Sequence, residues 1–190
     1  MEKILTIFER GWQGQKGVID EYIVEPGVLA TALATEKVDG TNVRLTVRNH
    51  TLVRLEKRRN PDRAQKASGI TEPWYVDADE SSSSDKWLFD SARHLDLTDI
   101  EDGEWSAEAF GKNIQGNPLQ WEQNHIFLFS HMPTLFKHTL PDAPIAFEEL
   151  KAWLPRQKST FNAERGIEGL VWWKDGQPIG KIKLKDFSKG

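Results

Sequence analysis

The sequence has no cysteine among its 190 residues, so disulfide bonds and thiolate metal sites are excluded. It has no apolar run long enough to span a bilayer, and no charged-then-apolar N-terminus of the kind that directs secretion. A basic excess is also missing, because the formal net charge is −4 at pH 7. Any contact with a polyanion must therefore depend on a local basic patch. Together these absences favour a protein of the reducing cytoplasm that does not contact a membrane.

The length and composition suit one globular domain that spans residues 1–190. Hydrophobic residues make up 38% of the chain and charged residues 28%, which is enough for a sizeable core. Short alternating segments separated by turns such as Pro26-Gly27 predict mostly strands. Amphipathic patterns predict one helix that follows a capping Asp85 and another over residues 146–154. The polar span 60–85 contains two prolines and a serine run, so we predict a flexible loop there.

The most informative stretch is Glu36-Lys37-Val38-Asp39-Gly40-Thr41-Asn42. The residues before it alternate as in an extended strand, so Lys37 is expected at the end of a strand. Gly40 permits a tight turn and the next strand begins directly after it, which predicts a hairpin. A bare Lys-x-Asp-Gly is common, however, and by itself it is more often a polar turn with a surface lysine.

Two further groups of cations accompany this stretch. In the strand predicted over residues 179–185, Lys181, Lys183 and Lys185 share one face, where they repel one another unless an anion lies between them. The second group, residues 57–59, is basic and ends an earlier predicted strand. Charge at such a position also serves to protect an exposed sheet edge.

In their order along the chain, these features resemble those of the covalent nucleotidyltransferases, the superfamily of ATP-dependent DNA ligases, RNA ligases and mRNA capping enzymes. The resemblance extends over almost the whole chain, and within the superfamily it is strongest to the compact 5′-to-3′ RNA ligases. The segments that carry it are EKVDGTN (36–42), EKRRN (56–60), AEAFGKNIQGNP (107–118), IFLFS (126–130), IEGLVWW (167–173) and KIKLKDF (181–187). Six features in this order are far more specific than any one of them.

This resemblance implies an α+β fold, an ATP-grasp-like ligase adenylation domain of two antiparallel sheets flanked by helices. It implies that Lys37 becomes covalently linked to AMP. It also implies that Lys181 and Lys183 are the paired lysines of the last motif, with Lys185 as a substitute. The other nucleotide-binding positions that it implies are Glu36, Asn42, Arg58, Glu108, Phe129 and Glu168.

The chemistry of each residue type agrees with such a role. A carboxylate such as Glu108 accepts hydrogen bonds from ribose hydroxyls. Phe129 offers an aromatic face to adenine, and Glu36 can read the exocyclic amine of that base. Glu168 is the carboxylate expected to reach the Mg²⁺ that accompanies ATP, or its waters, with Mn²⁺ as an alternative.

The nucleophile itself needs an activating environment. With an ordinary pKa of about 10.4, a lysine amine is protonated at neutral pH and cannot attack phosphorus. Burial, or the nearby cations Lys181 and Lys183, would depress the pKa of Lys37 and free its lone pair. The same two lysines can hold the α-phosphate and offset the charge that develops as pyrophosphate leaves.

The sequence therefore predicts an ATP-dependent RNA ligase that joins an RNA 5′-phosphate to a 3′-hydroxyl through a lysyl-AMP intermediate. DNA ligases and capping enzymes carry an OB-fold domain after the last motif, whereas this sequence ends three residues past Phe187. Two alternatives stay open. One is a DNA ligase or capping-type enzyme whose extra nucleic-acid binding comes from a partner protein with an OB domain. The other is a nucleotide-binding module without catalysis.

Overall fold

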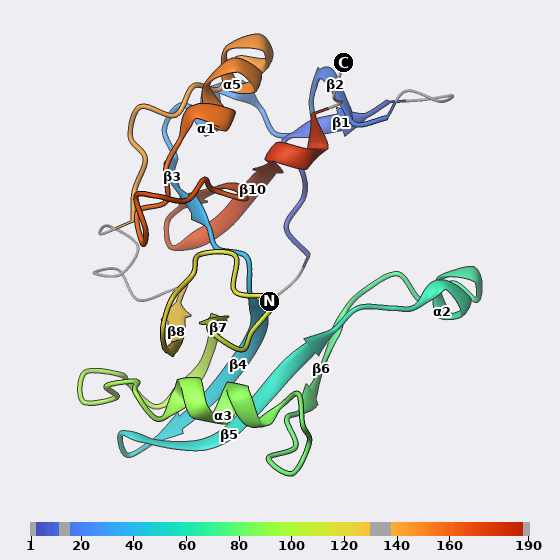
Figure 1. The fold of residues 1–190 in the computed structure, drawn as a ribbon. Coiled ribbons are helices and arrows are strands. Elements are labelled where there is room, and N and C mark those ends of the chain that lie inside the picture. The colour runs from blue at the N-terminus through green and yellow to red at the C-terminus, as the bar shows by residue number, and fades with distance from the viewer. Residues whose placement is uncertain (1–2, 12–15, 130–137, 188–190) are drawn as a thin grey trace. The chain divides into compact units, whose positions relative to one another are not determined.

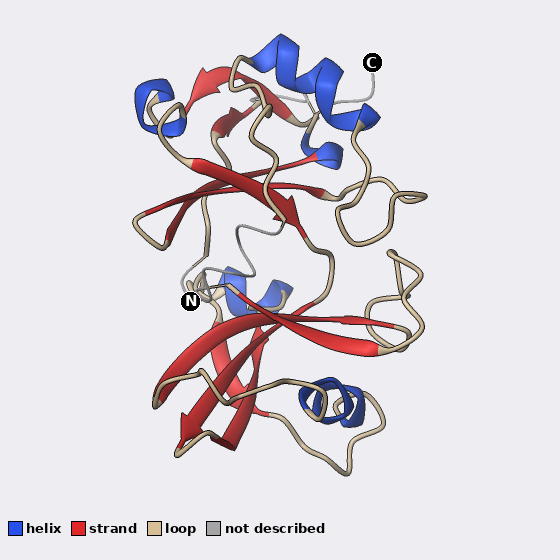
Figure 2. Cartoon of the chain, turned by 90° about the vertical axis from the view of Figure 1, so that its left-hand side faces the viewer, coloured by secondary structure: helices blue, strands red, loops and turns tan. Residues whose placement is uncertain are grey.

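The computed structural model describes residues 3–11, 16–129 and 138–187 of the chain (Figure 1). Antiparallel strands with short helices dominate it, so the predicted α+β class is confirmed (Figure 2). The chain divides into two compact units. One, here called the central unit, comprises residues 39–131 with residues 1–3, and the other, the terminal unit, comprises residues 4–38 and 132–190. Within the described ranges, no helix is both long and apolar enough to cross a bilayer.

The central unit is built on a five-stranded antiparallel sheet with the strand order β6-β5-β4-β7-β8. Its strands are β4 (Thr41–Arg48), β5 (Thr51–Arg59), β6 (Trp74–Asp77), β7 (Gly103–Gly111) and β8 (Asn124–Leu128). One face is apolar because Val43, Leu45 and Val47 alternate along β4 and are fully buried. Helix α3 (Lys86–Ala92) covers this face through Leu88 (Figure 1). The opposite face carries polar side chains from the intervening positions.

The polar span between β5 and α3 contains more regular structure than the sequence predicted. Residues 60–85 include helix α2 (Arg63–Ala67) and strand β6, so regular elements interrupt the predicted loop. Because β6 pairs with β5 from Glu56 to Arg59, the basic cluster does not lie on a free sheet edge, and that interpretation was wrong. Asp85 does precede α3, but its side chain makes no capping hydrogen bond.

The terminal unit combines a three-stranded antiparallel sheet, in the order β10-β9-β3, with a two-stranded sheet and short helices. Its elements are β1 (Phe8–Arg10), β2 (Val18–Tyr22), α1 (Pro26–Leu29), β3 (Leu33–Lys37), α5 (Phe147–Trp153), η1 (Leu154–Arg156), β9 (Gly169–Lys174), β10 (Gln177–Lys183) and η2 (Leu184–Asp186). The core of this unit is formed around Phe8, Leu150, Leu170 and Ile182, all of which are fully buried.

The structure corrects two local predictions in this region of the sequence. Pro26 begins helix α1 instead of a turn, since proline fits the first helical position, where no intrahelical hydrogen bond is required of its nitrogen. Strands β3 and β4, expected to pair as a hairpin, belong to different sheets. Strands β9 and β10 do form a hairpin, and Asp175 and Gly176 both have positive φ in its two-residue turn.

Candidate functional site

In the terminal unit, the register of the three-stranded sheet brings lysines from distant motifs onto one face. Lys37 of β3 pairs with Gly169 of β9, which in turn pairs with Lys183 of β10. Directly paired residues of an antiparallel sheet share a face, so both lysines lie on the same side with no side chain between them. Lys181 lies two residues before Lys183 on β10 and therefore joins that face. We call Lys37, Lys181 and Lys183 the lysine face.

Gly169 is required by the close approach of β9 and β10. A Cβ atom added at this position would overlap the carbonyl oxygen of Ile182 and crowd the Cα of Lys183. The glycine of the Glu-Gly motif is thus explained by backbone packing, and its lack of a side chain keeps the space between Lys37 and Lys183 open. Gly40 has the same kind of role in the central unit, where a Cβ would overlap the Ala109 carbonyl oxygen.

Glu168 neutralises part of the lysine face. Its Oε2 accepts a hydrogen bond from Lys37 Nζ at 2.7 Å, and its Oε1 lies 3.0 Å from Lys183 Nζ. Burial acts to raise the pKa of Glu168, but the two lysine ammonium groups outweigh burial, so the net effect is a lowered pKa. Glu168 is therefore a carboxylate at neutral pH, and its single negative charge lies between the two ammonium groups of Lys37 and Lys183.

The backbone at the end of β10 is fixed by Asp186, a residue that the sequence reasoning did not single out. Asp186 is buried, its Oδ2 accepts a hydrogen bond from the backbone N–H of Lys183 at 2.9 Å, and its Oδ1 accepts one from Arg10 at 2.7 Å. Because η2 begins at Leu184, Lys185 lies in a helical turn. The expectation that Lys185 shares a strand face with Lys181 and Lys183 was therefore wrong. The position of Asp186 three residues after Lys183 within KIKLKDF was the one available signal for its role.

Glu36 points to the opposite side of β3 from Lys37. It is 3% exposed, and its Oε2 accepts hydrogen bonds from the backbone N–H and the hydroxyl of Thr160 at 2.7 and 2.8 Å. Burial raises the pKa of Glu36 despite these hydrogen bonds. Its other oxygen, Oε1, is buried and has no hydrogen-bond partner among the described residues. A buried polar atom without a partner is rare, so this oxygen is an acceptor that a ligand or water could satisfy.

The central unit aligns three other predicted residues in one row across the polar face of its sheet. Glu108 of β7 pairs with Asn42 of β4. Since the neighbouring pair is Val43 with Lys57, Asn42 stands opposite Arg58 of β5. The row continues at both ends, because Glu108 pairs with Phe127 of β8 and Arg58 pairs with Tyr75 of β6. Residues that the sequence separates widely thus form one polar line with aromatic rings at its ends.

Tyr75 fixes the orientation of the Asn42 amide. Its hydroxyl donates to Asn42 Oδ1 at 2.6 Å, while Asn42 Nδ2 donates to the Ala107 carbonyl oxygen at 3.3 Å. The guanidinium of Arg44 lies 4.5 Å from the centre of the Tyr75 ring and holds the ring in turn. Sequence reasoning missed Tyr75 because it lies within the predicted loop, and no motif marked it.

Arg58 and Phe129 complete the set of predicted residues in the central unit. The Nε of Arg58 is buried and lacks a hydrogen-bond partner within the described part of the chain. Such a buried donor is costly unless a ligand or water satisfies it. Phe129 follows β8 directly, and its ring lies 5.9 Å from that of Phe127 in an edge-to-face arrangement. Ser130, the last residue of the IFLFS segment, lies outside the described residues.

Glu168 is the only carboxylate of the predicted metal site. Among residues 3–11, 16–129 and 138–187, no cluster of three or more His, Asp and Glu side chains could hold a metal ion. Mg²⁺ keeps most of its waters in proteins and commonly binds through one or two carboxylates together with substrate phosphates. A single carboxylate beside a face of lysines therefore fits Mg²⁺ or Mn²⁺ that arrives with a triphosphate.

No protein-family profile matches the chain, and no curated protein matches it. Among solved structures, the apo form of a mutant Naegleria gruberi RNA ligase is similar over 97% of this chain and 58% of its own, with a TM-score of 0.51 and 14% identity. A second mutant of that RNA ligase, with ATP and Mn, matches 80% of this chain and 48% of its own, with a TM-score of 0.49 and 16% identity. The chain spans less than two thirds of the length of these ligase chains. The first likeness shows that this chain shares the fold of that RNA ligase, as the sequence predicted.

Proposed function

We propose that this chain is an ATP-dependent RNA ligase. In the proposed cycle, Lys37 takes AMP from ATP, the AMP moves to an RNA 5′-phosphate, and an RNA 3′-hydroxyl then displaces AMP to close the strand. The observation that carries the proposal is the lysine face, where Lys37 and Lys183 flank a glycine and share the carboxylate of Glu168. The fold common to this chain and an RNA ligase supports it.

The first step needs an amine, an acceptor for its proton and positively charged groups around the phosphate. The Nζ of Lys37 forms a bond to the α-phosphorus while the bond from that phosphorus to the pyrophosphate oxygen breaks. Glu168 Oε2, at 2.7 Å, is the group in contact with the proton that Lys37 must lose. Lys181 and Lys183 offset the negative charge that grows on the departing pyrophosphate, which is the main task in phosphoryl transfer.

A divalent metal would be held at the Glu168 side of the lysine face and would supply further neutralisation of phosphate charge. For the nucleotide itself, Glu108 is suited to the ribose hydroxyls and Phe129 to the adenine ring. The orphaned Nε of Arg58 and Oε1 of Glu36 are a donor and an acceptor that a nucleotide could satisfy. The acceptor suits the exocyclic amine of adenine, so we assign Glu36 to the base and both Asn42 and Arg58 to polar groups of the nucleotide.

Intact-mass spectrometry after incubation with ATP and Mg²⁺ tests the first step. The wild-type chain should gain the mass of one AMP, whereas Lys37→Ala should gain none. Lys37→Arg should also fail, because a guanidinium stays protonated and cannot attack. Lys174→Ala is a matched control, since Lys174 is an exposed lysine of the same sheet that contacts only the Thr31 hydroxyl in the described structure. An AMP adduct of undiminished yield on Lys37→Ala would refute the assignment.

A second assay tests whether the chain joins RNA or DNA strands. Pre-adenylated protein is given matched nicks that differ only in ribose or deoxyribose at the 3′-hydroxyl end, and sealing rates are compared. Faster sealing of the ribose nick supports an RNA ligase, and equal rates indicate a DNA-type ligase. Label transferred from GTP instead of ATP would indicate a capping-type enzyme, and nucleotide binding without any adduct would indicate a binding module.

A further inference from the structure

A pocket of about 320 Å³ lies in the central unit, on the α3 side of the sheet. It is lined by Thr41, Lys57, Ser83, Ser84, Asp85, Trp87, Leu88, Asn113, Ile114 and Gln115, and we call it the Trp87 pocket. Adjacent residues of a strand point to opposite faces, so Thr41 and Lys57 turn away from the face that carries Asn42 and Arg58. The pocket is thus distinct from the polar row, although both use the same two motifs.

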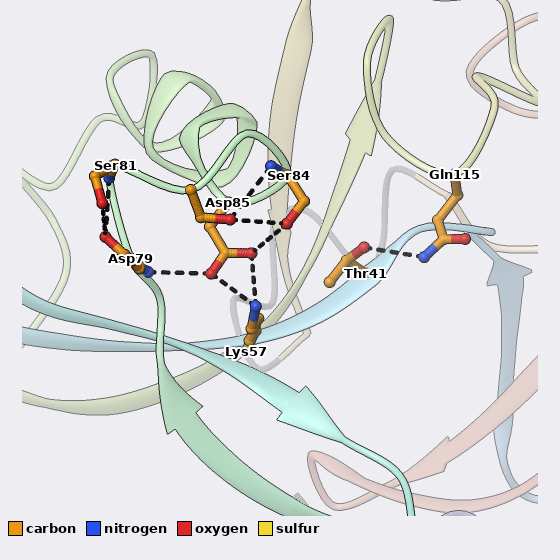
Figure 3. Close-up of polar contacts among 8 residues, drawn as sticks. Thr41, Lys57, Asp79, Ser81, Ser84, Asp85 and Gln115 are labelled. Carbon is orange, nitrogen blue, oxygen red and sulfur yellow. Dashed lines mark hydrogen bonds and ion pairs between the residues drawn. The ribbon is translucent and has the colours of Figure 1, made fainter. Parts of the chain in front are cut away.

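The ammonium group in this pocket is already neutralised. Lys57 Nζ donates to both carboxylate oxygens of Asp85 at 2.7 Å (Figure 3). Asp85 is 4% exposed and also accepts hydrogen bonds from the backbone N–H of Asp79 and the hydroxyl of Ser84, each at 3.1 Å. A closed ion pair of this kind offers little attraction to a free phosphate. The pocket therefore suits an uncharged group better than an anion.

The opposite wall offers amides and a hydroxyl. Gln115 Nε2 donates to Thr41 Oγ1 at 3.2 Å, which leaves the amide carbonyl oxygen of Gln115 as a further acceptor (Figure 3). Asn113 is held by Asn124, whose Nδ2 donates to Asn113 Oδ1 at 3.2 Å and whose Oδ1 accepts the Asn113 backbone N–H at 3.0 Å. Amides held in this way can match the paired donors and acceptors on the edge of a nucleobase.

Trp87, Leu88 and Ile114 supply the apolar part of the lining. Indole rings are the kind of surface on which bases of single-stranded nucleic acids stack, whatever their sequence. The volume is at the lower end of the range of about 300–1,000 Å³ for small-molecule sites, which suits a single nucleoside unit. The combination of amides, hydroxyls and an aromatic wall is the chemistry of nucleoside recognition, although the Lys86 ammonium lies 4.5 Å from the centre of the Trp87 ring and a base would have to share or displace it.

We propose that the Trp87 pocket binds one nucleoside of the RNA strand, with the base against Trp87 and the ribose hydroxyls near Thr41 and Ser84. This proposal rests on the proposed function, because it assigns part of the RNA substrate to the pocket. The proposal assigns a role in RNA binding to Lys57, to Gln115 of the GKNIQGNP loop and to the serine run. The adenylation step requires none of these residues. The 2′-hydroxyl would then distinguish RNA from DNA at this pocket.

The test uses an RNA hexamer with 5′- and 3′-hydroxyl ends that contains 4-thiouridine. This probe has no 5′-phosphate and so cannot receive AMP or be sealed at that end. Its affinity is measured by fluorescence anisotropy with and without ATP, and its ultraviolet cross-links are mapped by mass spectrometry. We expect cross-links within residues 84–88 or 113–115, and weaker binding of the corresponding DNA hexamer.

Two variants and one matched control complete the test. Gln115→Ala should weaken RNA binding about 3- to 10-fold, and Trp87→Leu about tenfold or more. Gln115 is exposed, so its replacement leaves the core intact. Gln120→Ala is the control, because Gln120 is an exposed glutamine with φ 53°, close to the 50° of Gln115, but it does not line the pocket.

The outcomes separate this proposal from the proposed enzyme. Unchanged RNA affinity in both pocket variants, or cross-links confined to other segments, would overturn the pocket assignment even if Lys37 takes AMP. Equal affinity for the DNA hexamer would overturn the role of the ribose hydroxyls. A selective loss in Gln115→Ala and Trp87→Leu, with Gln120→Ala unaffected, supports the pocket whether or not AMP is transferred.

Discussion

Replacing Glu168 by glutamine tests the electrostatics of the lysine face. Glutamine keeps the shape of the side chain but removes the charge that two lysines share at 2.7 and 3.0 Å. At 2.7 Å, the gross attraction within one such pair is about 6 kcal/mol for an effective dielectric constant of about 20. Most of this gain is offset by the desolvation of both groups, so the gross value cannot be the net contribution.

The net effect follows from how far the partners are buried. Removing one partner of a fully buried ion pair typically costs about 3–5 kcal/mol, because the other charge is left without compensation. Here the side chains of Lys37 and Lys183 are 19% and 24% exposed, so water can partly solvate them. A hydrogen bond to a charged group contributes about 1.5–3 kcal/mol. We therefore expect Glu168→Gln to lower the free energy of unfolding by about 2–3 kcal/mol at pH 7.

The pH dependence of this difference gives a second criterion. The pKa of Glu168 is lowered in the folded chain, so its contribution is complete above the ordinary glutamate pKa of about 4.3 and is lost as the pH falls through the lower, folded value. Urea unfolding of wild type and Glu168→Gln should thus differ at pH 7 and converge at strongly acidic pH. Glu148→Gln, at an exposed position in α5, should change stability by no more than about 0.5 kcal/mol. Equal stability of wild type and Glu168→Gln at pH 7, or a difference that does not depend on pH, would refute the reasoning.

Three further predictions concern the lysines, Tyr75 and Gly169. Lys181→Ala and Lys183→Ala should each slow adenylation about 10²- to 10³-fold, measured with radiolabelled ATP, whereas Lys185→Ala should spare it; the reverse pattern would contradict the strand register. Tyr75→Phe frees the Asn42 amide, so it should slow adenylation about 3- to 10-fold without loss of fold, while Tyr22→Phe, which removes a hydrogen bond to the Ile145 carbonyl, should leave adenylation unchanged. Gly169→Ala should lower the melting temperature sharply because its Cβ overlaps the Ile182 backbone. The control Gly27→Ala should not, because there is open space around the added methyl. Similar melting temperatures for the two variants would show that β9 and β10 can separate.

Sequence patterns predicted strands well where the determining signal is local. A strand was predicted over residues 179–185, and β10 runs from Gln177 to Lys183. Strand pairing, by contrast, depends on contacts between distant segments. The turn at Gly40 favoured a hairpin, but β3 instead pairs with β9, which no local pattern specifies. In the same way, nothing in the polar sequence around Tyr75 indicated that β6 would extend the sheet beside Arg58.

Strand register determines which of the predicted lysines lie together. The motif lysines come from segments far apart in the chain, yet the pairing of Lys37 with Gly169 and of Gly169 with Lys183 aligns them in one row. Lys185 does not belong to the lysine face because β10 ends at Lys183. The repeating Lys-x-Lys-x-Lys pattern could not reveal this boundary. The lysine pattern predicted a set of cations, and the hydrogen bond from the Lys183 backbone N–H to Asp186 holds the end of the strand that carries Lys181 and Lys183.

Adjacent residues within the motifs point to opposite faces of their strands, so a short motif places side chains at two separate surfaces. Lys37 faces Glu168 while Glu36 is buried on the other side of the same strand against Thr160. In the central unit, Asn42 faces the polar row while Thr41 lines the Trp87 pocket, and the alternation repeats in β5 with Arg58 and Lys57. A strand reverses side-chain direction at every residue, so one short motif can hold a nucleotide on one face and a second ligand on the other. Substitutions one residue apart should therefore affect different steps: Arg58→Ala should impair adenylation measured by intact mass, whereas Lys57→Met should alter RNA binding measured by anisotropy. Loss of both readouts in both variants would show that the two faces do not act separately.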